Sequence, residues 1–319
     1  MYDIIIIGAG PAGMTAGIYA ARREMKALII GKELGGQMIW ASDIENYPGF
    51  KSIDNYDLIV KMQDQVTSLG IEIKNEEVDK ITKLNNNSFI VNAKGKEYKS
   101  KTIVIAFGLS PRRLDIPGER ELTGKGVSYC ANCDGPLYRE KTVAVVGGGN
   151  SALDAAEVLS KIAARVYLIH RRGEFRGFEA LVEEVEKKDN LSFILNSEIK
   201  EIIGKNRLEK IKIFNNKTKK ESQLSVDGIF IEIGHIAHTD LVSNLVKRDE
   251  KKQIIVDEKC QTNVPGIFAA GDVTTIPFKQ ITIATGQGTI AALAAYQYLQ
   301  LKEGKNTGTF FDRSKNKIS

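Results

Sequence analysis

This 319-residue chain has few cysteines, no long apolar run and only a small excess of one charge. Its three cysteines are too few for a disulfide-stabilised scaffold. No stretch of about 18 apolar residues is present, so we expect no membrane-spanning helix. The net charge of +5 comes from 45 basic and 40 acidic residues. Because no dense basic block stands out, we do not expect nucleic-acid binding.

The composition is that of a folded protein with more than one domain. Hydrophobic residues make up 42% of the chain and charged residues 27%, both ordinary values for globular proteins. A chain of this length exceeds what one ordinary core organises, so we expect two domains. The first apolar run, Ile4–Ile7, follows no basic leader and is too short for a signal-peptide core. We therefore expect a cytoplasmic protein.

Two segments far apart in the chain repeat one pattern of apolar strand, glycine-rich turn and helix of small residues. A strand over Asp3–Ile7 leads into Gly8–Gly13, and a strand over Thr142–Val146 leads into Gly147–Ala152. Each helix is followed by another short apolar strand, at Ala27–Ile30 and Arg165–Ile169. The repeat predicts two βαβ units, each with a parallel sheet.

Further strand patterns suggest how the two units are connected. Apolar runs bounded by glycine predict strands at Thr102–Ala106, Gly228–Ile233 and Gly266–Ala270. Turn residues within 71–99 and 211–223 predict an antiparallel meander and a hairpin. Domain boundaries are expected near Pro117 and within 234–240. The second nucleotide-binding domain, 117–245, would then be inserted into the first, which comprises 1–116 and 246–319.

The first glycine turn has the features of a dinucleotide-binding site. Gly8, Gly10 and Gly13 fit the G-x-G-x-x-G pattern directly after a strand, and Pro11 and Ala12 complete the turn. The start of the following helix offers free N–H groups and a partial positive charge to a pyrophosphate. The pattern also expects an acidic residue about 20 residues on. The nearest candidate, Glu33, lies slightly late for a ribose contact.

The second glycine turn differs from the first in the charge that follows it. The turn fits G-x-G-x-x-A, and the candidate phosphate ligands around it are Gly147, Gly149, Asn150, Ser151 and Ala152. Basic residues follow the next strand where NAD would require a carboxylate: His170, Arg171, Arg172 and Arg176. Because arginine binds phosphate bidentately, this pattern favours NADPH, with its 2′-phosphate, over NADH. A solvated surface cluster is the alternative interpretation.

One cysteine pair has the spacing of a redox-active disulfide. Cys130 and Cys133 form a C-x-x-C motif, which is easily exchanged and often lowers the pKa of one thiol. A zinc site would need about two more ligands, and the sequence shows no such group. Two inert structural thiols are the other alternative. The remaining cysteine, Cys260, is interpreted as having no part in the chemistry.

Asp134 lies beside the second cysteine and is a candidate acid and base. Proton transfer must accompany the formation and release of a thiolate, and a carboxyl group can supply it. The alternative is a plain turn residue, because Asp134 precedes Gly135 and Asp-Gly is common in turns.

Together these motifs resemble the low-molecular-weight thioredoxin reductases along nearly the whole chain. The resemblance rests on the order and spacing of the following segments: Gly8–Gly13, Gly35–Gln37, Glu45–Gly49, Cys130–Gly135, Gly147–Ala152, His170–Arg172 with Arg176, Gly266–Asp272 and Gln280. It implies an α/β fold of two Rossmann-like domains with three ββα layers, in which an NADPH domain is inserted into an FAD domain. It also implies a homodimer.

The resemblance assigns residues to each cofactor and to each step. FAD would be bound by the first glycine turn and, beyond it, by Glu33, Gly35, Gly36, Gln37, Asn46, Gly108, Gly271, Asp272, Lys279, Gln280 and Ile281. NADPH would reduce FAD, which reduces the Cys130–Cys133 disulfide, with Cys133 nearer the flavin. Cys130 would then attack the disulfide of thioredoxin or a thioredoxin-like protein, while Asp134 handles protons.

The sequence departs from the family pattern in places, and rival functions stay open. Phe278-Lys279-Gln280 replaces the common Tyr-Arg-Gln, and the surrounding segment is similar to the flavoprotein of alkyl hydroperoxide reductase. The main alternative is an NADPH-dependent flavoprotein reductase of another protein disulfide, such as a glutaredoxin-like or peroxiredoxin-system carrier. A flavin enzyme that does not use its disulfide and a non-catalytic redox sensor are further alternatives.

Overall fold

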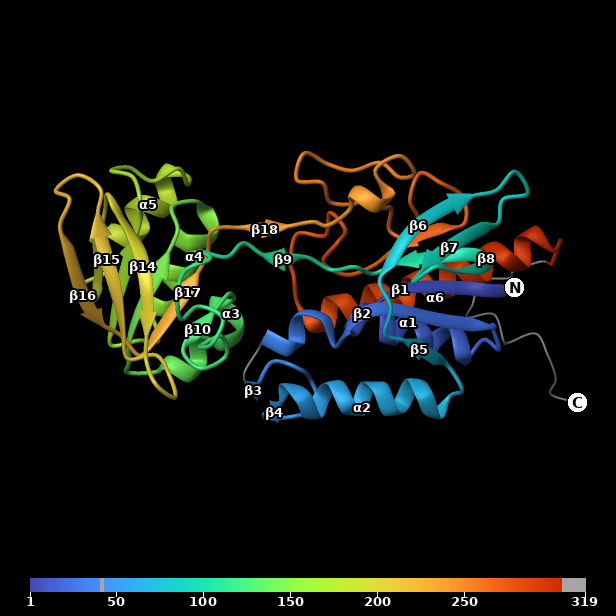
Figure 1. The fold of residues 1–319 in the computed structure, drawn as a ribbon, viewed down its shortest axis with the longest axis horizontal. Coiled ribbons are helices and arrows are strands. Elements are labelled where there is room, and N and C mark those ends of the chain that lie inside the picture. Colours follow the sequence, from blue (N-terminus) through green and yellow to red (C-terminus); the bar gives the residue numbers. More distant parts are fainter. Residues whose placement is uncertain (41–42, 306–319) are drawn as a thin grey trace, which may run out of the picture. The chain divides into compact units, whose positions relative to one another are not determined.

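A computed structural model describes residues 1–40 and 43–305, which form two compact units (Figure 1). The first unit comprises 1–38, 56–109 and the described chain from 237 onward; the second comprises 39–55 and 110–236. The division after residue 236 falls within the expected boundary region 234–240, whereas the bounds expected for the inserted domain, 117–245, lie several residues later along the chain. The reason is a strand pair, β9 (Ser110–Pro111) with β18 (His235–Ile236), that already belongs to the second unit.

The segment 39–55 is assigned to the second unit, which the sequence did not indicate. It contains the paired strands β3 (Asp43–Ile44) and β4 (Ile53–Asp54). Strand β3 lies against the short helix α3 (Ala131–Asp134) of the same unit. This contact is between residues distant in sequence, so no local pattern announces it.

The first unit is built on one mixed sheet. Its parallel part consists of β5 (Glu72–Lys74), β2 (Ala27–Leu34), β1 (Tyr2–Ala9), β8 (Lys96–Ile105) and β19 (Ile267–Ala269). Strands β6 (Val78–Lys83) and β7 (Phe89–Ala93) extend it antiparallel from β8. The meander expected over 71–99 is therefore correct for β6 to β8. It is wrong for β5, which pairs parallel to β2 because Leu28–Ile30 offers it a buried apolar edge.

Helices cover one face of this sheet, and apolar loops and strands fill the other. Helix α1 (Pro11–Ala21) packs closely against α6 (Ile281–Lys302), with Gly288 of α6 against the backbone of Ala12. Helix α2 (Asn55–Ser68) precedes β5, and a short 3-10 turn covers Asp240–Val242. The residues of β1 alternate, so that Ile5 and Ile7 join the core on the face opposite α1. This alternation follows from the period of two in a strand.

The second unit has three layers. Its central sheet is wholly parallel, in the order β10 (Val127–Ser128), β17 (Gly228–Ile231), β11 (Thr142–Val146), β12 (Arg165–Ile169) and β13 (Leu191–Ile194). Helices α4 (Asn150–Ser160) and α5 (Glu179–Glu186) pack on one face. A three-stranded antiparallel sheet packs on the other: β14 (Ser197–Ile203), β15 (Lys210–Asn215) and β16 (Glu221–Ser225).

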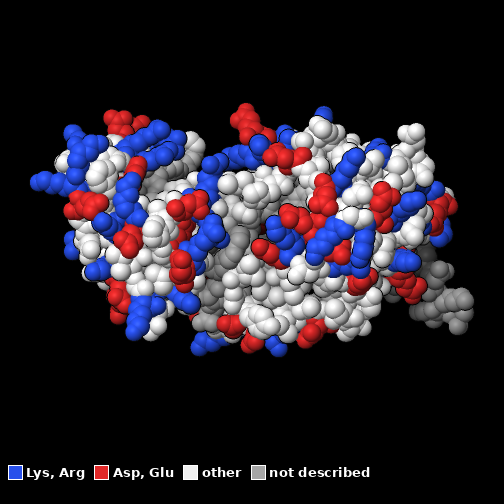
Figure 2. Space-filling model, in the orientation of Figure 1, with Lys and Arg blue, Asp and Glu red and all other residues white. Residues whose placement is uncertain are grey.

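These observations confirm the expected α/β class with parallel sheets. The hairpin expected over 211–223 is present as β15 and β16, and β14 adds a third strand that the sequence interpretation missed. Basic and acidic side chains are interspersed on the face seen in Figure 2, as the small net charge suggests. Within residues 1–40 and 43–305, no helix combines the length and the apolar character needed to cross a membrane.

The two sheets of the second unit are held together by aliphatic packing, which gives a stability prediction. Ile211 of β15 is fully buried between them. Ile211→Ala should lower the free energy of unfolding by about 2–5 kcal/mol, because the deletion loses transfer energy and leaves a cavity. Urea denaturation followed by circular dichroism measures it. Ile255→Ala is the control, since Ile255 is 44% exposed; an equal loss in both variants would contradict the packing argument.

Candidate nucleotide and redox sites

The first glycine turn leaves a helix start open to a ligand. Gly8 ends the straight part of β1 at φ +121, and any Cβ there would collide with the carbonyl oxygen of Ala106. Only glycine suits this position. Helix α1 then begins at Pro11, with Gly10 as its N-cap, no capping side chain and no acidic residue in its first turn. Its N-terminal N–H groups are therefore free for an anion.

A second segment of the same unit reaches this turn. Gly35 and Gly36 both have positive φ, of +88 and +56, and Gly36 lies beside Gly10. Gln37 follows, and its Nε2 donates to Oδ2 of Asp272 at 2.8 Å. Gly108, another expected flavin residue, is open on the side that faces Gln37. Four segments distant in sequence thus meet at one place.

Burial and neighbouring groups act in opposite directions on the pKa values of Asp272 and Lys279. Burial raises the pKa of the Asp272 carboxyl, while the charge of Lys279 and the hydrogen bond from Gln37 act the other way. Burial lowers the pKa of Lys279, whose Nζ donates to the carbonyl oxygens of Asp272 at 3.0 Å and Thr274 at 2.8 Å. The lysine therefore fixes the backbone after Gly271.

Helix α6 begins directly after this lysine. Gln280 is its N-cap and Ile281 its first residue, again without a capping side chain and without an acidic residue in the first turn. A helix of 22 residues therefore starts with free N–H groups and a partial positive charge. Gln280 and Ile281 thus lie at a positive helix end, which suits a group that gains negative charge.

Two further expected flavin residues are Glu33 and Asn46. Glu33 is exposed on β2, which extends past its expected end because it bulges opposite Ile7 and Ala9. Asn46 lies in the segment that the structure assigns to the second unit. The sequence interpretation missed Gln287 of α6, whose Oε1 accepts from the Gly271 amide at 2.8 Å.

The second glycine turn has the same construction. Gly147 has φ +156, and a Cβ there would overlap the carbonyl oxygen of Glu232. Helix α4 starts at Asn150 with Gly149 as N-cap, no capping side chain and no acidic residue in the first turn. Gly149 has open space on its side-chain position. Helix α4 therefore starts without a side-chain cap, and the Ala152 amide donates to the Gly149 carbonyl oxygen at 3.1 Å.

The basic segment after β12 folds back over this turn. Arg176 N donates to the carbonyl oxygen of Gly148 at 2.7 Å, and Phe178 N donates to Oδ1 of Asn150 at 2.8 Å. The side chains of Arg171, Arg172 and Arg176 are exposed. Within the described chain none of these three arginines forms an ion pair. They are available for an external anion near the helix start.

His170 is placed differently from the arginines. It is only 4% exposed, its ring lies under Gly148, and it stacks on Phe175 at 5.6 Å between ring centroids. Burial, followed by the charges of Arg176, Arg171 and Arg172, lowers its pKa. Its Nε2 has no hydrogen-bond partner among the described residues. The His170 ring therefore lies against the turn at Gly148, in surroundings that disfavour its protonated form.

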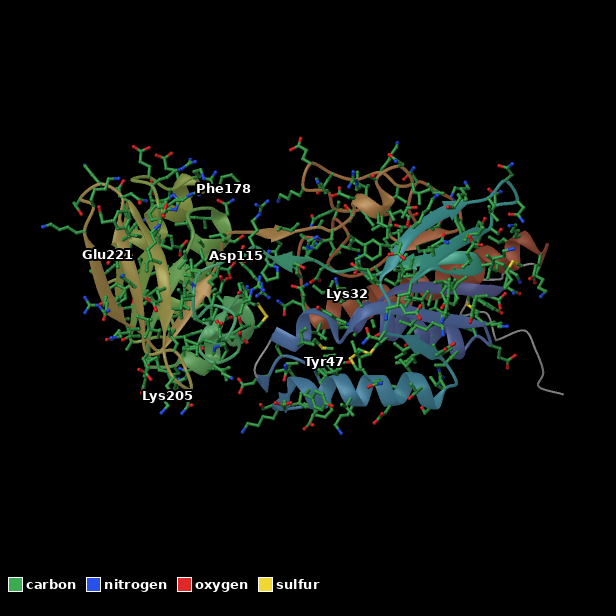
Figure 3. All side chains as sticks on the ribbon, viewed as in Figure 1. Lys32, Tyr47, Asp115, Phe178, Lys205 and Glu221 are labelled. Carbon is green, nitrogen blue, oxygen red and sulfur yellow. A yellow bond between two sulfur atoms is a disulfide. The ribbon has the colours of Figure 1, made fainter. Side chains whose placement is uncertain are left out.

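Cys130 and Cys133 are joined in a disulfide at the start of α3 (Figure 3). Cys130 is the N-cap, and its Sγ accepts from the Cys133 amide at 3.2 Å. Asp134 is buried, and its Oδ2 accepts from the Ser128 hydroxyl at 2.6 Å. Burial raises the pKa of Asp134, and the Ser128 hydrogen bond partly offsets this. The carboxyl group is thus placed to hold a proton next to the sulfur atoms.

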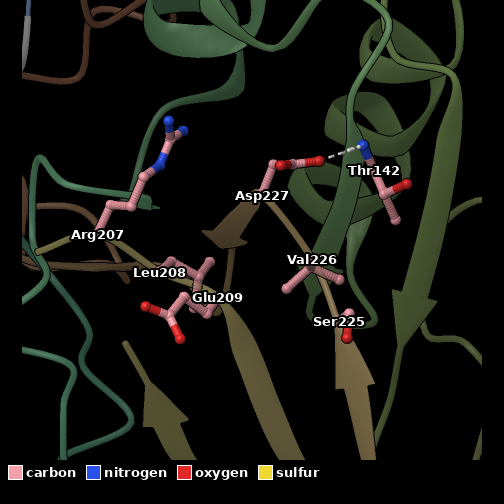
Figure 4. A pocket seen from close by; sticks show the side chains of 7 residues that line it. All are labelled: Thr142, Arg207, Leu208, Glu209, Ser225, Val226 and Asp227. Atoms are coloured by element: carbon pink, nitrogen blue, oxygen red, sulfur yellow. Dashed lines mark hydrogen bonds between the residues drawn. The ribbon is translucent and has the colours of Figure 1, made fainter. Parts of the chain in front are cut away.

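Neither a metal-binding group, nor Cys260, nor the surface pocket adds a further candidate site among the described residues. Among the described residues no group of three potential ligands could hold a metal, and Cys260 is buried with its thiol pKa raised to about 12 by burial. A surface pocket, shown in Figure 4, is lined by Thr142, Arg207, Leu208, Glu209, Ser225, Val226 and Asp227. Asp227 accepts there from the Thr142 amide at 2.9 Å and fixes the start of β11. None of the expected site residues lines this pocket.

The two turns therefore fit dinucleotides, because no side chain caps the helix that follows each turn and because Gly8 and Gly147 have no room for a Cβ atom. Both turns lie at the carboxyl ends of parallel strands, where ligands bind in open α/β sheets. The second is accompanied by arginines that form no ion pair with any described residue, and a disulfide lies in the same unit.

Comparison with known proteins gives a consistent result. A family model described as pyridine nucleotide-disulphide oxidoreductase matches residues 2–288. A thioredoxin reductase of Listeria innocua is 40% identical over 307 residues, covering 95% of this chain and 96% of that protein. A thioredoxin reductase of Bacillus subtilis is 38% identical over 303 residues, with coverages of 94% and 95%.

Solved structures agree. The crystal structure of thioredoxin reductase from Streptococcus pyogenes has a TM-score of 0.91 and 40% sequence identity, and the match covers 94% of this chain and 99% of that one.

The Ser128–Asp134 contact gives a prediction that needs no substrate. Ser128→Ala removes a hydrogen bond to the ionised carboxylate, so the pKa of Asp134 should rise further. A hydrogen bond of about 0.5–1.5 kcal/mol corresponds to a rise of up to about one pH unit. Titration of isotope-labelled aspartate carboxyl signals by NMR, assigned with Asp134→Asn, measures it. Ser225→Ala, at an exposed serine of β16, is the control; an unchanged or lower pKa in Ser128→Ala would exclude the stabilising role of the hydroxyl.

Proposed function

Because the chain belongs to the pyridine nucleotide-disulphide oxidoreductase family, and within it to the thioredoxin reductases, we propose that it is an FAD-containing, NADPH-dependent reductase of the thioredoxin disulfide. The observation that carries the proposal is the Cys130–Cys133 disulfide in the same unit as a complete nucleotide-binding turn. The curated relatives named thioredoxin reductases favour thioredoxin over the other protein disulfides considered as substrates.

FAD is assigned to the first unit. The amides of Ala12 and Gly13 at the start of α1 would bind its pyrophosphate, because that helix start is uncapped. Gln37 and Asp272, joined by their hydrogen bond, would contact the polar chain between pyrophosphate and ring. The start of α6 at Gln280 and Ile281 would then face the ring, where its partial positive charge favours the reduced state.

NADPH is assigned to the second unit. The start of α4, with Gly149, Asn150 and Ser151, would bind the pyrophosphate. The exposed side chains of Arg171, Arg172 and Arg176 would bind the 2′-phosphate, which only NADPH carries. His170 would act indirectly, since its ring lies beneath Gly148.

The protein's own residues would carry the disulfide exchange. The bound cofactors supply the pair of electrons that opens the Cys130–Cys133 disulfide. As a thiolate, Cys130 attacks one sulfur of the substrate disulfide, and a mixed disulfide forms as the substrate's other sulfur leaves. Cys133 then attacks Cys130, which restores the internal disulfide and releases the reduced substrate. Asp134, whose pKa is raised by burial, gives and takes the protons.

Two further properties are proposed with this function. The protein would work in the cytoplasm, where thiols are kept reduced and a C-x-x-C pair is generally catalytic. It would form a homodimer, as the sequence resemblance implies. Sedimentation equilibrium of the purified protein tests the second property.

A reductive titration tests the electron circuit. Under anaerobic conditions, NADPH should bleach the flavin absorbance, and the wild type should take up one more pair of electrons per chain than Cys133→Ser, because only the wild type has a reducible disulfide. The visible spectrum during titration gives both quantities. Cys260→Ser, which changes the buried third cysteine, is the control and should behave as wild type. Equal uptake by wild type and Cys133→Ser would remove the disulfide from the circuit.

The arginine assignment has a separate test. Arg171→Ala and Arg172→Ala should each raise KM for NADPH by about 10- to 100-fold, the loss expected for a charge-assisted hydrogen bond to phosphate, and leave KM for NADH unchanged. Steady-state kinetics with both nucleotides measure the change. Lys205→Ala removes an exposed cation of the same unit on the turn between β14 and β15 and should change neither value (Figure 3). Parallel loss for NADPH and NADH would refute the phosphate role.

A further inference from the structure

Glu232 connects the second nucleotide turn with the disulfide. It directly follows β17, and its amide donates to the carbonyl oxygen of Val146 at 2.8 Å, next to Gly147. The Glu232 carbonyl oxygen occupies the space that a side chain at Gly147 would need. Its side chain points to α3, where Oε1 accepts from the Ala131 amide at 3.4 Å. One residue therefore contacts both the turn and the redox helix.

The Ala131 amide is the first N–H group after Cys130. N–H groups at a helix start, together with the helix dipole, normally stabilise a cysteine thiolate at that position. At α3 the Cys133 amide points at the Cys130 sulfur, at 3.2 Å, but the Ala131 amide points at Glu232. The Glu232 carboxyl thus accepts from one of these N–H donors, and when ionised it places a negative charge against the amide that directly follows Cys130.

The surroundings leave this carboxylate without a neutralising cation. Burial raises the pKa of Glu232 to about 7, the Ala131 amide opposes this, and the charge of Asp154 on α4 adds to it. No basic side chain pairs with Glu232 in the described part of the chain. Asp134 is the other carboxyl near the cysteines, and it accepts a hydrogen bond from the hydroxyl of Ser128, which lies two residues before Cys130. The charge of Glu232 therefore changes with pH near neutrality.

We infer that Glu232 is a positioning residue that opposes ionisation of the Cys130 thiol after the disulfide is reduced. When Cys130 loses its proton, the new thiolate competes with the Glu232 carboxylate for the start of α3, and each charge favours a proton on the other group. Glu232 thereby limits how much reactive thiolate the reduced protein holds. The inference rests on the proposed function only in taking Cys130 as the attacking thiol.

The test measures the ionisation of Cys130 directly. In the full-length flavoprotein with Cys133→Ser, the rate of alkylation of Cys130 by iodoacetamide is followed against pH, with mass spectrometry to confirm the modified residue. Adding Glu232→Gln should lower the midpoint of the profile by about one pH unit, the effect expected when a nearby like charge is removed. Alkylation below the midpoint should then be about tenfold faster. Glu232→Asp, which keeps the charge, should restore a midpoint near that of the parent.

Glu221→Gln is the matched control, since Glu221 is an exposed carboxyl of β16 paired with Lys212 and should leave the profile unchanged (Figure 3). If Glu232→Gln impairs folding, the parent still decides the question. NMR titration of its glutamate carboxyls should show one signal with a second inflection at the Cys130 midpoint, which alkylation of Cys130 by iodoacetamide abolishes. An unchanged or higher midpoint in Glu232→Gln, or no such coupled signal, overturns the inference. Failure of Cys130→Ser to abolish thioredoxin reduction would instead overturn the proposed function alone.

Discussion

Uncapped helix starts are the feature on which both nucleotide sites depend. In α1 and α4 a glycine occupies the N-cap, and neither first turn carries an acidic residue. Because no described side chain caps either helix start, the N-terminal N–H groups and the helix dipole suit an anion. The surrounding structure keeps them accessible: Gly8 and Gly147 allow the backbone to pass against Ala106 and Glu232, where any side chain would collide. Gly36 lies beside Gly10 at the first start, and the Arg176 amide donates to the Gly148 carbonyl oxygen at the second.

The redox helix follows the opposite principle, because its start is occupied by the protein itself. Cys130 caps α3 and receives the Cys133 amide, while Glu232 receives the Ala131 amide. Two carboxyl groups with raised pKa values, Asp134 and Glu232, therefore lie around one disulfide. Burial is the main cause in both, and each is offset by a single hydrogen bond. This arrangement favours holding protons near the sulfur atoms over permanent thiolate.

Local patterns were sufficient wherever neighbours in sequence decide the structure. The two strand–turn–helix units follow from apolar runs and glycine spacing, and the cysteine pair follows from its two-residue gap. Patterns failed where the partner is distant in sequence. No local signal shows that β5 joins a parallel sheet, that β14 completes an antiparallel one, or that 39–55 belongs with α3. Gln287 was missed because nothing in a helix sequence distinguishes a buried glutamine from an exposed one.

By itself the sequence determined the α/β class, the two nucleotide turns, the basic segment after β12 and the redox pair, because each depends on residue type and short spacing. Only the tertiary structure decided which side chains share an environment. It separated the exposed arginines from the buried His170, joined Gln37 to Asp272, and brought Glu232 to the amide after Cys130. Burial and hydrogen bonding between distant segments set these pairings and the pKa values that follow, and a linear pattern contains neither.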